Sequence, residues 1–296
     1  MREPQSLWWT SADGGRLHAL DWRGENEAVP IIGLPGLNRT GRDFEPLAGW
    51  LGGRRRVIGV DLRGRGRSDN DPDAQRYAMP TYVEDVDRLL DHIGAARAIL
   101  IGGSNGGVVA ALYAAQHAGR VAGLVFNDVA HRFQSSAFVK VRDQIRANPR
   151  WPDWAAATNA MIDRYRTVHP GYGQREWEAL ARRALRQEPD GTIMPDFDTR
   201  ILIPLETPGG PPVFDLMPIY QASAHIPSLL LHGSLSEFLT PETADELAAA
   251  LPLLERVDVA DVGHLPDLAE PECVAAIERL LARVDASQDS FDRRGG

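Results

Sequence analysis

Cysteine is nearly absent from this sequence of 296 residues. The single cysteine, Cys273, excludes an internal disulfide and any cysteine-rich metal site. Because Cys273 falls in a helical pattern near the C-terminus, we interpret it as a packed thiol. We expect no bound metal.

Long apolar runs and clustered positive charge are also missing. No run reaches the length that spans a membrane, and the first residues, MREPQSLWWT, hold no apolar segment long enough for a signal peptide. We therefore expect no membrane partner and a cytoplasmic location. The net charge is −9 and no basic run is present, which argues against a nucleic-acid partner. Nothing in the sequence indicates an oligomeric state.

What the chain does contain is an alternation of strand and helix patterns. It begins with a hairpin pattern over residues 6–22, around the turn Asp13-Gly14-Gly15. Apolar strand patterns cover residues 29–36, 55–61, 97–103, 121–128, 227–233 and 255–261. Helical spacing covers residues 81–94, 105–119, 241–252 and 271–284. This order predicts an α/β fold whose mostly parallel sheet is covered by helices on both faces.

Residues 131–225 interrupt that alternation. They contain helical stretches such as QREWEALARRALRQ, several tryptophans and an irregular, proline-rich linker at 190–212. A long insertion of this kind is usually a lid or a binding element. We therefore predict a core domain from residues 1–130 and 226–285, a helical cap over 131–225 and a flexible tail over 286–296.

The stretch GGSNG, residues 102–106, matches the G-x-S-x-G pattern between a strand pattern and a helical pattern. That context is typical of a nucleophilic serine held on a sharp strand-to-helix turn. Side chains two positions before or after Ser104 would collide with the neighbouring strand and helix, which explains the glycines. The alternative is a tight turn in which the serine is incidental.

Together, four segments resemble the α/β-hydrolase superfamily: LPGLNRTGRDF, DLRGRGRSD, GGSNGG and VGHLPDLAEPE. The resemblance extends over nearly the whole chain. It implies an eight-stranded, mostly parallel sheet, a cap inserted after the sixth strand, and a catalytic triad of serine, acid and histidine. It also implies a cofactor-independent hydrolase.

The resemblance assigns His264 as the catalytic base, because it lies in the G-H-x-P loop before the last helix. The backbone N–H groups of Asn105 and Leu37 are the candidate oxyanion-hole donors. We interpret His232 and Asp61 as structural. The same holds for the remaining histidines, which are structural or exposed: His18, His92, His117, His131, His169 and His225.

The triad acid has two candidates. Glu237 follows the strand pattern at 227–233, the commoner position for the acid in this superfamily, and Asp128 follows the strand pattern at 121–128. We prefer Glu237. The position expected for the acid falls near Ser236, one residue earlier, and the glutamate side chain, which is one methylene longer than that of aspartate, could offset this shift. Asp128 remains the alternative.

The expected substrate is a small, fairly apolar ester or lactone. Trp151, Trp154 and Trp177 are expected to line its site, because apolar and aromatic side chains line most small-molecule sites. A hydrolase of carbon–carbon bonds would use the same triad, and a catalytically inactive ligand receptor would use the same fold.

Overall fold

An eight-stranded sheet forms the centre of the protein, in the order β1-β2-β4-β3-β5-β6-β9-β10. The computed structural model describes residues 3–25, 28–132, 134–206 and 215–295. The first two strands, β1 (Gln5–Thr10) and β2 (Arg16–Trp22), form the expected hairpin, and β2 pairs antiparallel with β4. The other pairs are parallel. The predicted eight-stranded, mostly parallel sheet is therefore confirmed.

The parallel part of the sheet consists of five strands whose residues are all buried and of the edge strand β10, which is mostly half-buried. Its members are β3 (Ile31–Leu34), β4 (Val57–Asp61), β5 (Ala98–Gly103), β6 (Val121–Asn127), β9 (Ser228–Gly233) and β10 (Leu254–Val259). Alternate residues of a strand face opposite sides: Ile32 and Leu34 belong to one apolar cluster, and Ile31 to the other.

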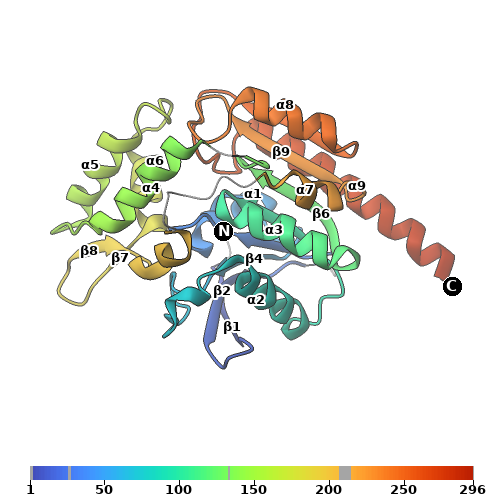
Figure 1. The fold of residues 1–296 in the computed structure, drawn as a ribbon, viewed down its shortest axis with the longest axis horizontal. Helices are drawn as coiled ribbons and strands as arrows, with labels where there is room; N and C mark the ends of the chain where they lie inside the picture. Colours follow the sequence, from blue (N-terminus) through green and yellow to red (C-terminus); the bar gives the residue numbers. More distant parts are fainter. Residues whose placement is uncertain (1–2, 26–27, 133, 207–214, 296) are drawn as a thin grey trace.

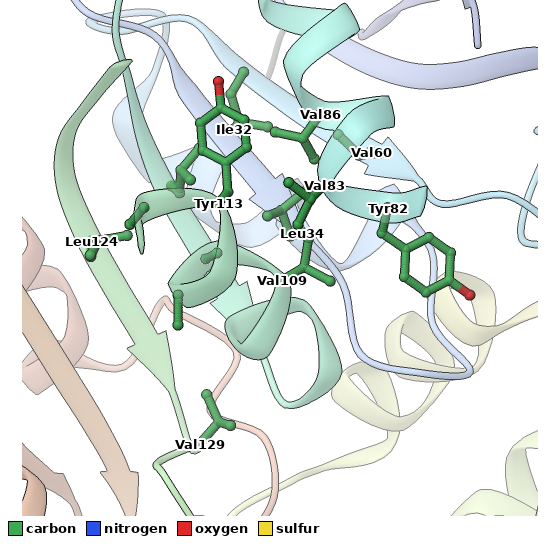
Figure 2. Packing of buried hydrophobic residues seen from close by; sticks show 14 of the residues in the cluster. Ile32, Leu34, Val60, Tyr82, Val83, Val86, Val109, Tyr113, Leu124 and Val129 are labelled. Atoms are coloured by element: carbon green, nitrogen blue, oxygen red, sulfur yellow. The ribbon is translucent and has the colours of Figure 1, made fainter. Parts of the chain in front are cut away.

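Helices cover both faces of this sheet (Figure 1). On one face lie α2 (Met79–His92), α3 (Asn105–Gln116), α7 (Met217–Ala222) and α8 (Pro241–Ala250). On the other face lie α1 (Glu45–Leu51) and α9 (Pro271–Gly295). Figure 2 shows Val83 and Val86 of α2 and Val109 of α3 beside Ile32 and Leu34 of β3. Cys273 is buried on the α9 side, as a packed thiol.

The segment after β6 is mainly helical. It contains α4 (Ser135–Ala147), α5 (Trp154–Tyr165), α6 (Gln174–Ala184) and the short 3-10 helix Thr199–Leu205. A small hairpin, β7 (Leu185–Gln187) and β8 (Ile193–Pro195), replaces the expected end of the helix and part of the linker. Residues 207–214 of the linker lie outside the described residues. The cap boundaries at 131 and 225 remain a prediction, and α7 packs against α3 of the core.

The helix α9 extends into the segment expected to be a tail, and the flexibility of residues 286–296 remains a prediction. α9 continues to Gly295, because no proline or glycine interrupts residues 285–294. Across the described residues, none of the helices is both long and apolar enough to cross a bilayer.

Candidate active site

Ser104 lies at the junction between β5 and α3, in a backbone conformation that few residues adopt. Its φ is 48° and its ψ is −118°. Such a conformation costs on the order of 1–3 kcal/mol for a residue other than glycine, and it persists where the surrounding structure holds it. Two backbone hydrogen bonds hold the turn: Ser104 N–H donates to Asn127 O at 3.2 Å, and Gly107 N–H donates to Ser104 O at 2.9 Å.

The glycines around Ser104 make this turn sterically possible. A Cβ atom on Gly102 would lie 2.4 Å from the carbonyl oxygen of Gly106, and a Cβ on Gly106 would lie 2.0 Å from the carbonyl oxygen of Leu34. A Cβ on Gly107 would lie 2.2 Å from Val129 Cγ1. The collisions expected from the sequence are therefore confirmed.

His264 is paired with Asp128, which follows β6. The imidazole Nδ1 lies 2.7 Å from Asp128 Oδ2, and the Asp128 side chain is fully buried. Asp128 also accepts hydrogen bonds from Gly233 N–H at 3.0 Å and from the Ser236 hydroxyl at 2.5 Å. The ring of Phe238 stacks on His264 with the centroids 3.9 Å apart. The imidazole is thus held both by a buried carboxylate and by an aromatic face.

Glu237 does not contact His264, so the sequence-based preference for Glu237 is corrected to Asp128. Both carboxylate oxygens of Glu237 accept from Lys140 Nζ, at 2.7 and 2.8 Å, and 53% of the Glu237 side chain is exposed. The reason lies in the turn after β9. The Ser236 hydroxyl, which donates to Asp128, also accepts from the N–H groups of Phe238 and Leu239, and the next side chain is directed outward.

The residues of the two expected oxyanion donors, Leu37 and Asn105, line the same cavity as Ser104. Leu37 belongs to a turn closed by a hydrogen bond from Arg39 N–H to Gly36 O at 3.1 Å, and the Leu37 carbonyl accepts from Arg65 Nε at 2.8 Å. Asn105 is the first residue of α3. Neither backbone N–H donates to any residue that the structure describes. Both groups therefore remain candidates for binding a developing oxyanion.

A cavity of about 1100 Å³ connects these groups. Ser104, His264, Asp128, Leu37 and Asn105 all line it. Most of the remaining described lining is apolar and comes from the segment after β6 and from α3; it includes Leu112, Phe138, Val141, Met161 and Leu185. Between described residues, no hydrogen bond joins the Ser104 hydroxyl to His264. Such contacts are often long without substrate and shorten in the substrate complex.

Of the three tryptophans expected to line the substrate site, Trp151 lines the cavity, whereas Trp154 and Trp177 are not among its described lining residues. Trp177 is buried inside the cap and packs against the Tyr172 ring, with the centroids 5.0 Å apart. The indole of Trp154 lies under the Arg182 guanidinium, 4.0 Å from the ring centroid. These two indoles are used in packing within the cap, so they are corrected to structural residues.

The segment after β6 binds the histidine loop directly, which the sequence analysis did not predict. Asp267, three residues after His264, accepts from the Tyr172 hydroxyl and from Arg183 Nη2, both at 2.7 Å. Gly263 N–H donates to Val168 O at 2.6 Å. The presence of Asp267 in the motif GHLPD was a sequence feature that could have indicated a contact to this loop, but nothing near it in the sequence indicated its partners.

His232 and Asp61 have the structural roles expected of them. His232 Nδ1 lies 2.6 Å from Asp258 Oδ1 and its Nε2 lies 3.1 Å from Leu239 O. Asp61 binds His18 Nδ1 at 2.7 Å and accepts from Gly41 N–H at 2.8 Å. The described residues contain no group of three or more His, Cys, Asp or Glu side chains arranged to hold a metal ion.

His169 is buried at the cavity wall and remains neutral over a wide pH range. Burial lowers its pKa to about 4; the Asp267 carboxylate opposes this, whereas the charges of Arg39, His264 and Arg183 add to it. The ring stacks on Tyr172, with the centroids 4.6 Å apart. A neutral imidazole keeps one donor and one acceptor at physiological pH.

We expect this histidine to make folding stability depend on pH. Below pH 6.5 the unfolded chain protonates the imidazole, whereas the folded chain does so only near pH 4, so stability falls as the pH drops through this window. The His169→Gln variant should therefore lose about 2 kcal/mol less than wild type between about pH 7 and about pH 5. Urea unfolding at both pH values measures the difference. The exposed His225→Gln variant is the matched control, and equal losses in His169→Gln and wild type would contradict the prediction.

Comparison with known proteins agrees with this fold. A family model described as alpha/beta hydrolase fold matches residues 29–160. The crystal structure of an alpha/beta hydrolase from Novosphingobium aromaticivorans is 37% identical, covers 96% of this chain and 99% of its own, and superimposes with a TM-score of 0.89. A 3-hydroxybutyrate-oligomer hydrolase from Cupriavidus necator is 29% identical over 270 residues, which cover 88% of this chain and 90% of that protein.

Proposed function

Because the chain belongs to the α/β-hydrolase family, we propose that it is a serine hydrolase that cleaves an ester or lactone bond in a small, largely apolar substrate. One observation carries this proposal: the strained Ser104 and the His264–Asp128 pair line the same cavity. A serine and a histidine held by a buried carboxylate are the groups that acyl transfer requires.

The proposed reaction begins with attack of Ser104 Oγ on the substrate carbonyl. His264 Nε2 accepts the hydroxyl proton, while Asp128 holds the Nδ1–H tautomer and stabilises the imidazolium that forms. The N–H groups of Leu37 and Asn105 bind the developing oxyanion. His264 then protonates the leaving group, which yields an acyl-enzyme. Water activated by His264 releases the acid and restores Ser104.

An ester or lactone is preferred over other acyl substrates for two reasons. The cavity lining is mostly apolar, which favours an uncharged scissile group in an apolar chain. In addition, the relative from Cupriavidus necator is named for hydrolysis of 3-hydroxybutyrate oligomers, whose units are joined by ester bonds.

A fluorophosphonate probe tests the nucleophile, and a substrate panel tests the bond that is cleaved. We expect intact mass to increase by one adduct, peptide mapping to place it on Ser104, and short-chain esters or lactones to be hydrolysed. Folded protein that gains no adduct and cleaves no ester would contradict the proposal and support an inactive receptor. Cleavage of vinylogous diketones but not of esters would instead support a hydrolase of carbon–carbon bonds.

A further inference from the structure

Arg39 is a charged residue in an otherwise largely apolar cavity, and the proposed acyl transfer does not use its side chain. It belongs to the same turn as Leu37, closed by its own N–H to Gly36 O. Its side chain lines the cavity and is 18% exposed. A cation this deep in an active-site cavity needs either a structural or a substrate-binding explanation.

The stem of Arg39 and the Cβ of Ser104 both lie close to Gly36. A Cβ placed on Gly36 would lie 3.4 Å from Arg39 Cγ and 3.8 Å from Ser104 Cβ. Both side chains therefore lie close to the same point, at the start of the oxyanion loop. A group bound by the guanidinium would be only a short chain away from a carbonyl at Ser104.

One edge of the guanidinium, formed by Nε and Nη2, is bound by Asp43, whereas its Nη1 end is not bound by any described residue. Asp43 accepts from Nε at 2.7 Å and from Nη2 at 2.5 Å, and no described residue accepts from Nη1. Burial disfavours the cation, but the Asp43 carboxylate, with smaller contributions from Tyr165 and Asp267, raises the pKa of Arg39, which stays charged. Asp43 thus holds the guanidinium in place through one edge and leaves its Nη1 end available.

Arg63 of the same chain shows that a guanidinium held in this way binds further carboxylates at its other end: its Nη1 donates to Asp71 Oδ2 at 2.5 Å and also to Asp13. Asp85 occupies its Nε and Nη2 edge, both at 2.7 Å. Asp13 accepts from its other end, from Nη1 at 2.9 Å and from Nη2 at 3.0 Å. Among the residues that the structure describes, no carboxylate bonds to the equivalent end of Arg39, and the Arg39 side chain lines the cavity.

The other charges of the cavity wall are already engaged or exposed. Lys140 pairs with Glu237, and Arg132 with Glu246. Asp267 is bound by Arg183 and Tyr172, and Asp128 by His264. Arg164 is exposed. Arg39 is therefore the cavity cation best placed to attract a negatively charged substrate group.

We propose that the Nη1 end of Arg39 binds a carboxylate of the substrate, so that the preferred substrate is an anionic ester with a free carboxylate a few atoms from the scissile bond. This carboxylate site rests on the proposed function, and it specifies in addition that the preferred substrate carries a negative charge. Guanidinium and carboxylate pair in a planar, two-bond geometry that also fixes orientation. The apolar lining would then contact the carbon chain between the carboxylate and the ester.

Two matched ester pairs test this proposal and show which half carries the carboxylate. Mono-4-nitrophenyl glutarate is compared with 4-nitrophenyl pentanoate, and 4-acetoxybenzoate with its methyl ester. In at least one pair we expect kcat/KM of wild type to favour the anionic ester. The Arg39→Gln variant should lower that ratio by about 10- to 100-fold, the size of a charge-assisted pair. The Arg279→Gln variant on α9 is the charge-matched control, because this arginine is 53% exposed and lies outside the described cavity lining, and it should keep the wild-type ratio.

A second variant and a binding measurement keep the test independent of folding and of turnover. The double variant Arg39→Gln/Asp43→Asn avoids leaving Asp43 as an unpaired charge, and it should lose the same preference. Calorimetry on Ser104→Ala protein compares monomethyl glutarate with dimethyl glutarate, with and without Arg39→Gln. Equal binding of the two ligands together with equal kcat/KM for the esters would overturn the carboxylate site. An Arg39-dependent binding preference without any ester turnover would support the site and overturn the proposed hydrolysis.

Discussion

The Ser104→Ala variant is expected to lose about 10⁶ in kcat on any ester that the wild type cleaves. Without Oγ no acyl-enzyme forms, and only substrate binding and the oxyanion donors remain to assist attack by water. The backbone at residue 104 keeps its φ of 48° because neighbouring strands and glycines impose it. Alanine needs no more space there than serine, so the fold should be unchanged.

Steady-state kinetics with an active ester measures this loss, and circular dichroism checks the fold. The Ser6→Ala variant, which removes a hydroxyl from edge strand β1, is the control and should retain wild-type kcat. Fluorophosphonate should label wild type and Ser6→Ala but not Ser104→Ala. A folded Ser104→Ala enzyme with more than about a hundredth of wild-type kcat would contradict covalent catalysis by this serine.

The Asp128→Asn variant is expected to lose about 10⁴ in kcat. An amide accepts from Gly233 N–H as the carboxylate does, but it no longer selects the Nδ1–H tautomer of His264 or stabilises the imidazolium. The matched Glu237→Gln variant breaks only an exposed pair with Lys140 and should stay within about threefold of wild type. Parallel assays on one ester compare the two variants.

The opposite result would show that the triad acid is Glu237, in the loop after β9. A near-normal Asp128→Asn enzyme beside an inactive, folded Glu237→Gln enzyme would show that the contact between His264 and Asp128 is not the catalytic one. Because Asp128 also binds Ser236, a Ser236→Ala variant separates support of the carboxylate from catalysis. It removes one hydrogen bond to Asp128 and should cost far less than Asp128→Asn.

The local parts of the site could be predicted from sequence because they depend on neighbours along the chain. Gly102 and Gly106 are required by the turn at Ser104, since a Cβ on either would collide with nearby backbone atoms. The buried strands are readable as apolar runs for a similar reason: a parallel strand covered on both faces must be apolar at nearly every position. The position of His264 also followed from a short motif before the last helix.

Contacts between distant segments could not be predicted in this way. The choice between Asp128 and Glu237 depended on the direction of two side chains, one after β6 and one after β9. The Asp128 carboxylate is directed into the interior, whereas the Glu237 carboxylate is directed to solvent. Shifting a carboxylate by one position along the chain is enough to reverse its direction. Trp154 and Trp177 are aromatic residues of the type that often lines a substrate site. In the structure, however, the Trp154 ring contacts the Arg182 guanidinium and the Trp177 ring packs against Tyr172.

By itself, the sequence determined the α/β alternation, the glycine-supported turn at Ser104 and the loop of His264, because each follows from backbone sterics or from apolar periodicity over a few residues. Only the tertiary structure decided that Asp128 holds His264, that Asp267 binds Tyr172 and Arg183, and that Arg39 and Ser104 line the same cavity. These contacts join residues from separate strands, loops and cap helices. Their direction is set by side-chain packing across the fold, which no short window of sequence contains.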